Sequence, residues 1–216
     1  MNSITLPRNA HAGKKHALHV FCDASKRTFG VVAYVVSEDG TVQFLSSRAR
    51  VAPKSQVSKE ENLTVPRLEL TALLFGCRFA KYLTSIRDRP YSDIYIWSDA
   101  KVALAWVESQ TSTSTYVVNR AREIKDLAYE YYYNIQYVST NENPADIASK
   151  GCSAAFLKSS SLWKNGPSWL SNYNGPETSP LVALMLACPA RVHQPYPCAN
   201  FSRFKTLDQA CEAYGR

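Results

Sequence analysis

The stretch LHVFCDASKRTFGVVAYVVSEDGTVQFLSSRARV, residues 18–51, decides the fold class. Its parts at 18–25, 30–36 and 41–51 are rich in Val, Phe, Tyr and Thr, the residues that strands favour. The segment SEDG, residues 37–40, joins the last two parts and has the composition of a hairpin turn. We therefore predict three consecutive strands that form an antiparallel meander.

Helices and further strands alternate after this meander. The predicted elements are a helix from Pro66 to Leu83, a strand at 93–100, helices at about 100–110 and 117–132, a strand at 134–140 and a short helix at 143–151. The order is βββ-α-β-α-α-β-α. It predicts an α/β fold with a mixed five-stranded sheet, in which three antiparallel strands are followed by two parallel additions, with flanking helices.

Four segments differ in composition along the chain. Residues 1–16 are polar, and we expect a flexible N-terminal segment. Residues 17–152 hold the predicted elements of one domain. Residues 153–200 are rich in Pro, Gly and Ser, which predicts a linker with local docking. Residues 201–216 are predicted to contain one last helix.

Composition excludes some classes of protein. The net charge of +7 suits an anionic partner, although basicity alone is weak evidence for nucleic acid. Six scattered cysteines without a CxxC pair argue against a zinc knuckle and for reduced thiols inside the cell. The N-terminus lacks the apolar core of a signal peptide, and the apolar run LVALMLAC at 181–188 is too short to span a bilayer. We expect a soluble cytoplasmic protein without a membrane partner, with the nucleus as an alternative location.

Glu69 is unexpected in the predicted helix VPRLELTALLFGCRFA, residues 65–80. At about 100° per residue, Leu73, Gly76 and Ala80 share its side of the helix, which should pack inward. A carboxylate buried without partners is costly, so it must pair, shift its pKa or bind a metal. From this helix alone, the simpler explanations are a salt bridge to a buried Arg and a helix rotated so that Glu69 reaches the rim.

Three aspartates stand in comparable places. Asp23 ends the first strand, Asp99 ends the fourth, and Asp146 lies in the first turn of the last short helix. Singly, they could be a turn residue, a helix N-cap and an acid that completes a capping arrangement with Asn143. If the first and fourth strands are neighbours, however, Asp23 and Asp99 meet at one edge that Glu69 and Asp146 can reach. Such a cluster of carboxylates needs cations, because the negative charges repel one another. Carboxylate oxygens favour Mg²⁺ or Mn²⁺, and two such ions could bind a phosphodiester between them.

Six stretches carry a resemblance to a known family. They are HVFCDASKRTFGVVAYVV, SSRARVAPKSQ, LTVPRLELTALLFG, IWSDAKVALAWV, YVVNRAREI and YVSTNENPADIASKG, in family order over residues 18–151. The sequence resembles the ribonuclease H domain of Bel/Pao-type LTR retrotransposons. Downstream, LWKNGPSWL resembles the block that follows this domain in such polyproteins. The terminal FSRFKTLDQACEAYG resembles the start of the region that leads into the integrase, which is cut off here.

The resemblance implies a function and a site. The function is endonucleolytic hydrolysis of the RNA strand of RNA–DNA hybrids during reverse transcription, beside the reverse transcriptase and integrase domains of the parent polyprotein and within virus-like particles. Asp23, Glu69, Asp99 and Asp146 would be catalytic and would bind two Mg²⁺ or Mn²⁺ ions. Asp23 and Asp99 would bridge both ions, Glu69 would contact the ribose side, and Asp146 would hold the ion that positions the attacking water.

Further residues are candidates for contact with the substrate: Ser25, Arg48, Lys54, Ser98 and Asn143. For the basic residues, an ordinary solvated surface explains the pattern equally well. The chain departs from retroviral domains in the loop STNENPAD, which lacks the histidine that many of them carry there. Either that role is absent, or a residue at 141–143 lines the site differently.

Two other functions fit parts of the sequence. A catalytically silent or co-opted nucleic-acid-binding module would keep the fold without cleavage, although the intact set of four acids argues against decay. The second alternative function is that of another nuclease, or of a transposase, with the same fold. Exonuclease relatives usually place their first two acids one residue apart, and integrase-type sites place the glutamate last. Neither pattern occurs here, which favours a ribonuclease H.

Overall fold

The computed structural model describes residues 15–52, 64–87, 90–109 and 114–173. The chain divides into two units, Met1–Met185 and Leu186–Arg216, and every described residue belongs to the first. The predictions for residues 1–14, for the second part of the linker and for the last helix lie outside the described residues.

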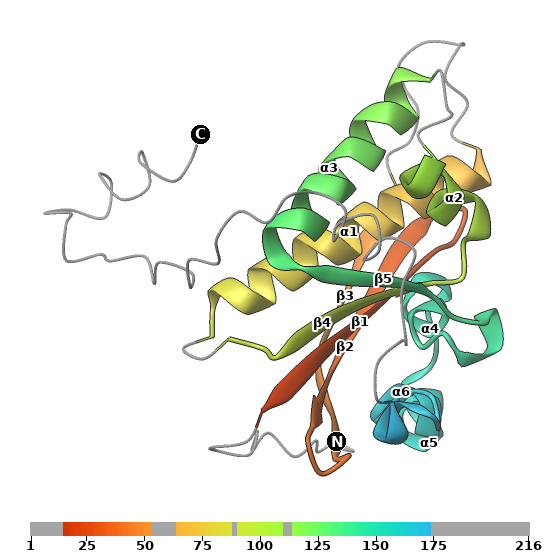
Figure 1. Ribbon diagram of the computed structural model, residues 1–216. Coiled ribbons are helices and arrows are strands. Elements are labelled where there is room, and N and C mark those ends of the chain that lie inside the picture. Colours follow the sequence, from red (N-terminus) through yellow and green to blue (C-terminus); the bar gives the residue numbers. More distant parts are fainter. Residues whose placement is uncertain (1–14, 53–63, 88–89, 110–113, 174–216) are drawn as a thin grey trace, which may run out of the picture. The chain divides into compact units, whose positions relative to one another are not determined.

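A mixed five-stranded sheet forms the centre of the first unit (Figure 1). The strands are β1 (His16–Ala24), β2 (Thr28–Ser37), β3 (Val42–Val51), β4 (Asp93–Ser98) and β5 (Tyr133–Tyr137). Their order in the sheet is β3-β2-β1-β4-β5. The first three strands pair antiparallel, whereas β4 pairs parallel with β1 and with β5. This topology confirms the predicted α/β fold, with its meander and two parallel additions.

The four helices predicted within residues 17–152 begin and end close to the predicted positions, and two further helices, α5 and α6, were not predicted. They are α1 (Val65–Ser85), α2 (Lys101–Ser109), α3 (Thr115–Tyr131), α4 (Ala145–Lys150), α5 (Ala154–Ser159) and α6 (Ser161–Asn165), with 3₁₀ turns η1 (Thr140–Glu142) and η2 (Leu170–Asn172). Pro66 occupies the first turn of α1, where its missing N–H leaves no hydrogen bond unmade. No helix among the described ranges is both long and apolar enough to cross a membrane.

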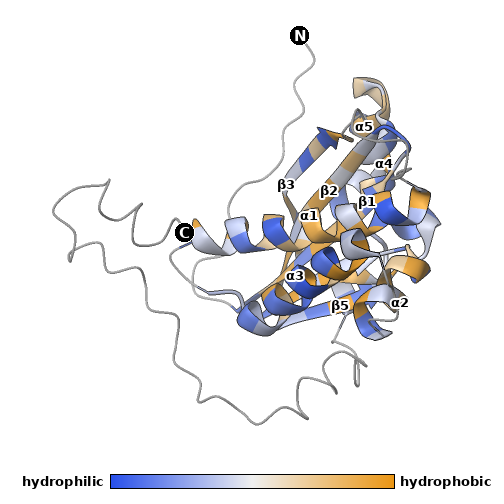
Figure 2. Ribbon diagram, turned by 90° about the horizontal axis from the view of Figure 1, so that it is seen from above, coloured by the Kyte–Doolittle hydropathy of each residue, from blue (hydrophilic) through white to orange (hydrophobic). Residues whose placement is uncertain are grey.

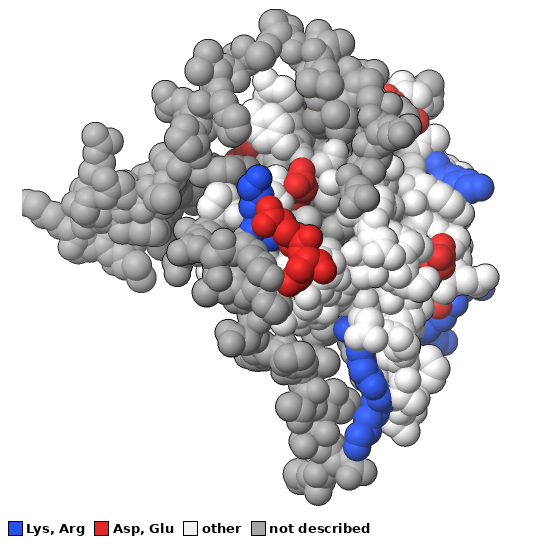
Figure 3. Space-filling model, turned by 60° about the horizontal axis from the view of Figure 1, so that its bottom comes forward, with Lys and Arg blue, Asp and Glu red and all other residues white. Residues whose placement is uncertain are grey.

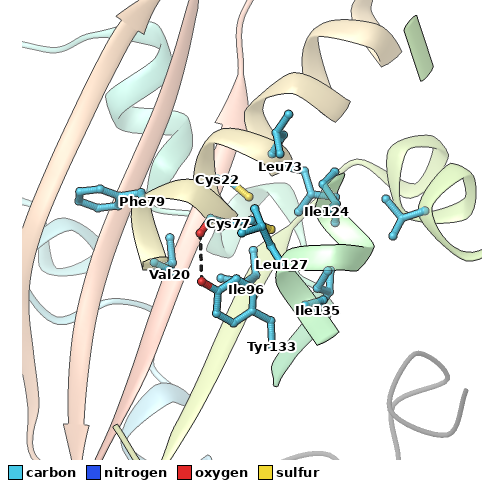
Figure 4. Packing of buried hydrophobic residues seen from close by; sticks show 14 of the residues in the cluster. Val20, Cys22, Leu73, Cys77, Phe79, Ile96, Ile124, Leu127, Tyr133 and Ile135 are labelled. Atoms are coloured by element: carbon cyan, nitrogen blue, oxygen red, sulfur yellow. Dashed lines mark hydrogen bonds between the residues drawn. The ribbon is translucent and has the colours of Figure 1, made fainter. Parts of the chain in front are cut away.

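The larger core lies between the sheet and α1 with α3. Figure 2 shows hydrophobic and hydrophilic residues on both helices, as expected for helices with one buried side. Apolar side chains of the two helices and of the central strands meet in this layer (Figure 4). The phenol of Tyr133 in β5 donates a hydrogen bond of 3.2 Å to the carbonyl of Cys77 in α1. This bond fixes α1 along the parallel half of the sheet.

A second core covers the opposite face of the sheet. Phe21, Tyr34 and Trp97 point into it and are buried. Leu170 from η2, together with Trp163 and Trp169, packs against them. The phenol of Tyr34 donates to the backbone carbonyls of Leu162 and Trp163, at 3.0 and 2.8 Å.

His19 belongs to the same aromatic layer. Its Nδ1 accepts a hydrogen bond of 3.1 Å from Trp97 Nε1, and its ring stacks on Tyr95 with centroids 4.6 Å apart. Burial lowers the pKa of His19 to about 3, so the ring is neutral at physiological pH. This histidine therefore serves the core.

The second core includes residues beyond position 152, where the domain was predicted to end. In the segment expected to be a linker with local docking, residues 153–173 form α5, α6 and η2 (Figure 1), and Trp163, Trp169 and Leu170 pack on the sheet. These few large apolar side chains decide the packing, despite the Pro, Gly and Ser content, because burial scales with apolar area.

Replacing Leu170 with alanine tests this layer. The Leu170 side chain has no exposed surface, so its truncation is expected to lower the free energy of unfolding by about 2–5 kcal/mol, as for other buried leucines. Urea unfolding of the full chain measures the change. Leu45→Ala, at a leucine that is 40% exposed, is the matched control and should cost far less. Equal costs would show that residues 153–173 do not pack on the sheet.

Candidate functional site

Two of the predicted acids lie at one edge of the sheet. In the parallel pairing of β1 with β4, Cys22 is opposite Ser98. Asp23 directly follows Cys22, and Asp99 directly follows Ser98. Both side chains therefore lie at the carboxyl end of the parallel pair β1 and β4. This arrangement confirms the prediction that the first and fourth strands are neighbours.

Glu69 approaches this edge from α1. Gly76, two turns further along the helix, lies so close to β1 that a Cβ there would be 3.2 Å from Cys22 Sγ. Glu69 itself is half-buried, in keeping with a position at the rim of the packed face. Within the described residues it forms no ion pair, so the predicted alternative of a buried arginine partner is not found there.

Asp146 enters from α4, which packs against β2 and β1. The contact depends on Gly30, which pairs with Asp23 across the sheet. A Cβ on Gly30 would lie 2.6 Å from the backbone nitrogen of Ser149 and 2.7 Å from the carbonyl oxygen of Ala145. Because only glycine lacks this atom, Gly30 allows α4 to lie directly on the strand.

Each aspartate has a polar partner. Ser149 Oγ donates to Asp23 Oδ2, Asn143 Nδ2 donates to Asp99 Oδ1 at 3.3 Å, and Lys150 Nζ is 2.7 Å from Asp146 Oδ1. Their partners, Ser149, Asn143 and Lys150, all belong to α4 or to the residues just before it. α4 and the residue Asn143 before it therefore supply the groups that stabilise the three aspartates.

Asn143 is completely buried and joins three elements. Besides Asp99, its Nδ2 donates to the carbonyl of Cys22 at 3.1 Å, and its Oδ1 accepts from the backbone N–H of Ala145 at 3.1 Å. The amide of Asn143 is thus used inside the protein, and its contact with substrate stays a prediction. The N-cap of α4 is Pro144, without a side-chain hydrogen bond, so the alternative in which Asp146 completes a capping arrangement with Asn143 is not found.

The acids perturb one another electrostatically. Burial raises the pKa of Asp23, the hydrogen bond from Ser149 opposes this rise, and the charges of Asp99 and Asp146 add to it. Burial also raises the pKa of Glu69, with further contributions from Asp99 and Asp23. Asp99 and Asp146 therefore lie close enough to Asp23, and Asp99 and Asp23 close enough to Glu69, to make the ionisation of Asp23 and Glu69 less favourable.

The donor set fits a hard divalent cation in its chemistry. It offers only carboxylate oxygens, which Mg²⁺ and Mn²⁺ prefer, and a cation would relieve the mutual repulsion. As the side chains stand, no three Asp, Glu, His or Cys residues in the described ranges are close enough together to hold one ion. In this arrangement the aspartates contact Ser149, Asn143 and Lys150.

The other predicted substrate contacts have different surroundings. The Ser25 hydroxyl accepts the N–H of Thr28 at 3.1 Å and stabilises the turn after β1. Ser98 Oγ is buried and accepts the N–H of Ala100 at 3.2 Å. The guanidinium of Arg48 lies 4.5 Å from the centroid of Tyr82 in α1. Lys54 is outside the described residues.

The basic residues do not concentrate on the face that Figure 3 shows. The Lys and Arg side chains described there stand apart from one another, and acidic side chains gather near the centre. Among the described residues, the Lys and Arg side chains in this view form no continuous basic patch.

Gly30 and Ser149 are site residues that the sequence analysis did not identify. For Ser149 a signal exists, because a residue three positions after Asp146 shares its side of a helix. The role of Gly30 depends on a helix more than a hundred residues away in the chain, and no local pattern predicts it.

Part of the chain matches a model of a known protein family. Residues 1–100 match the family model described as the Pao retrotransposon-like RNaseH-like domain. The matched residues include Asp23, Glu69 and Asp99, whereas Asp146 lies beyond them. No curated protein matches the chain.

Solved structures of ribonucleases H are similar to this RNase H-like domain. RNase H1 of the archaeon Halobacterium salinarum is 12% identical, with 61% of this chain and 90% of that chain covered and a TM-score of 0.43. The N-terminal RNase H domain of a Mycobacterium tuberculosis protein is 14% identical, with 64% and 95% covered and a TM-score of 0.44. The protease–reverse transcriptase of prototype foamy virus is 12% identical, with 68% and 22% covered and a TM-score of 0.41.

Gly30→Ala tests the approach of α4. The added methyl would overlap the backbone of α4, so α4 must move, and we expect a loss of about 1–3 kcal/mol in the free energy of unfolding, as for overpacked cores. Hydrogen–deuterium exchange should become faster in α4 and stay unchanged in α3, which serves as the internal control. Unchanged stability and exchange would contradict the close contact.

Glu69→Gln tests the electrostatics of the cluster. In EDTA at pH 7 the variant is expected to melt at the same temperature as the wild type or higher, because a charge held near Asp23 and Asp99 is removed. A raised pKa means that the wild type loses stability as the pH rises through that value. The difference should therefore vanish below the ordinary glutamate pKa of 4.5. Glu38→Gln, at an exposed glutamate, is the control. Marked unfolding of Glu69→Gln would instead indicate a structural ion pair.

Proposed function

We propose that this RNase H-like domain cleaves the RNA strand of RNA–DNA hybrids endonucleolytically, with divalent metal ions, during reverse transcription of a retrotransposon. The observation that carries the proposal is the gathering of Asp23, Glu69, Asp99 and Asp146, from four different elements, at one edge of the sheet. The family of the domain supports the same chemistry. In this setting the domain acts beside the reverse transcriptase and integrase of a polyprotein, inside the cell.

The four carboxylates would hold two Mg²⁺ or Mn²⁺ ions. When bound, such ions stabilise negative charge on a phosphodiester and make a water molecule more acidic. The chain's own residues bind and orient: the carboxylates supply the ligands, and the buried amide of Asn143 fixes Asp99 relative to β1. Burial raises the pKa values of Asp23 and Glu69, and the neighbouring carboxylates add to the rise.

Basic residues at the rim of the site are suited to contact phosphates. Lys26 and Arg27 are exposed in the turn that follows Asp23, and Lys101 is exposed at the start of α2, directly after Asp99 and Ala100. Phosphate contacts of this kind position a duplex without reading its sequence. Selection of a hybrid would then depend on the shape of the duplex and on the 2′-hydroxyl groups of the RNA strand.

A non-catalytic nucleic-acid-binding module is the second candidate function. It is favoured by the present arrangement of the acids, in which the described residues provide no three ligands close enough for one ion, and the aspartates are held by Ser149, Asn143 and Lys150. Such a module would bind the hybrid with the same basic rim and leave both strands intact.

Cleavage of an end-labelled RNA–DNA hybrid distinguishes the two functions. The wild-type chain with Mg²⁺ or Mn²⁺ is expected to cut only the RNA strand. Asp99→Asn should reduce the rate by at least about a hundredfold, because removing even a hydrogen-bond partner of a metal ligand costs about ten- to a hundredfold. Asp93→Asn is the matched control, since Asp93 is exposed at the opposite end of the same strand and should leave cleavage unchanged. Hybrid binding without cleavage by the wild type would support the second function.

A further inference from the structure

We propose that Ser149 is a positioning residue of this site: its hydroxyl holds Asp23 Oδ2 so that the other carboxylate oxygen remains directed to a metal ion. The inference rests on the proposed function and adds a residue to it. It is carried by the contacts of Ser149 with Asp23 and of its backbone with β2.

The hydroxyl of Ser149 joins two of the acids. Ser149 is 2% exposed, and its Oγ contacts Asp23 Oδ2 and lies 3.2 Å from the backbone carbonyl of Asp146. A serine hydroxyl has one proton to donate, and the shorter contact directs it to the carboxylate of Asp23. Because the side chain is buried, water cannot easily take its place if the hydroxyl is removed.

A hydrogen bond to one oxygen restricts the direction of the other, and the backbone N–H of Ala24 also interacts with the carboxylate of Asp23. An ionised carboxylate has two oxygens with about four acceptor positions. Since Oδ2 of Asp23 accepts from Ser149, rotation of the carboxylate about its Cβ–Cγ bond is restricted, and Oδ1 keeps one direction. Groups that fix a metal ligand in this way commonly change metal affinity when they are removed.

The backbone of Ser149 is fixed by the strand next to Asp23. Thr28 Oγ1 donates to the carbonyl oxygen of Ser149. On the other side of the residue, the backbone nitrogen of Ser149 lies over Gly30, within 2.6 Å of where a Cβ would be. Gly30 is paired with Asp23 in the sheet. Strand β2 therefore positions both the donor, the Ser149 hydroxyl, and the acceptor, the Asp23 carboxylate. This arrangement distinguishes Ser149 from a serine that merely fills space in a helix.

Ser149→Ala is the test, with Ser153→Ala as the matched control. Both substitutions remove one hydroxyl with a hydrogen-bond partner, but Ser153 Oγ caps α5 by accepting the N–H of Phe156 at 3.2 Å and contacts none of the acids. We would measure the melting temperature of the full chain as Mg²⁺ or Mn²⁺ is titrated, and cleavage of the hybrid over the same range.

The expected result is a shift in metal dependence. In Ser149→Ala the metal concentration for half-maximal stabilisation and for half-maximal cleavage should rise about ten- to a hundredfold, the range seen when partners of metal ligands are removed. Ser153→Ala should keep the wild-type concentrations, with a similar fall of the melting temperature in EDTA. Thr28→Val leaves the Ser149 hydroxyl in place and loosens only its backbone. Thr28→Val should also raise the half-maximal metal concentrations, by a smaller factor. If Ser149→Ala does not fold, Thr28→Val is the variant that tests the inference.

Two outcomes would overturn the inference, and they can be told apart. If the wild type cleaves and Ser149→Ala shows the metal dependence of Ser153→Ala, Ser149 has no positioning role although the proposed function stands. If the wild type neither cleaves the hybrid nor gains stability from either metal ion, the proposed function fails and the inference fails with it.

Discussion

The parallel pairing of β1 with β4 is the constraint on which the rest of the site depends. Its register places Cys22 opposite Ser98, and the two following aspartates, Asp23 and Asp99, therefore lie at the same edge. A slip of one residue would turn every side chain of one strand to the opposite face of the sheet. The pairing is secured from both sides, because β1 and β4 bury large apolar residues in each of the two cores.

Carboxylates that lie close together at that edge lower the stability of the fold, and neighbouring side chains offset part of this loss. Repulsion and burial raise the pKa values of Asp23 and Glu69. Ser149, Asn143 and Lys150 then supply hydrogen bonds and one positive charge to the three aspartates. All three groups reach the sheet with α4, so the approach of this short helix over Gly30 decides the state of the whole cluster.

The second aromatic layer shows where composition misleads. A segment rich in Pro, Gly and Ser was expected to be a linker, yet Trp163, Trp169 and Leu170 pack on the sheet. Composition averages over a segment, whereas a few large side chains suffice to dock it when a matching apolar surface is available. The sheet offers that surface through Phe21, Tyr34 and Trp97, and no property of residues 153–173 alone reveals it.

The sequence by itself determined the elements up to α4, the order of their types along the chain and the set of four candidate acids. The elements follow from periodicity, turn residues and caps, which act over a few neighbouring positions. Only the tertiary structure decided which side chains meet the acids, how closely α4 lies on β2, and that residues 153–173 pack on the sheet. The contact of Ser149 with Asp23 spans 126 residues of chain. Packing between residues so far apart in the sequence depends on how well the two surfaces fit each other. Neither stretch of sequence alone determines the shape of the surface it will meet.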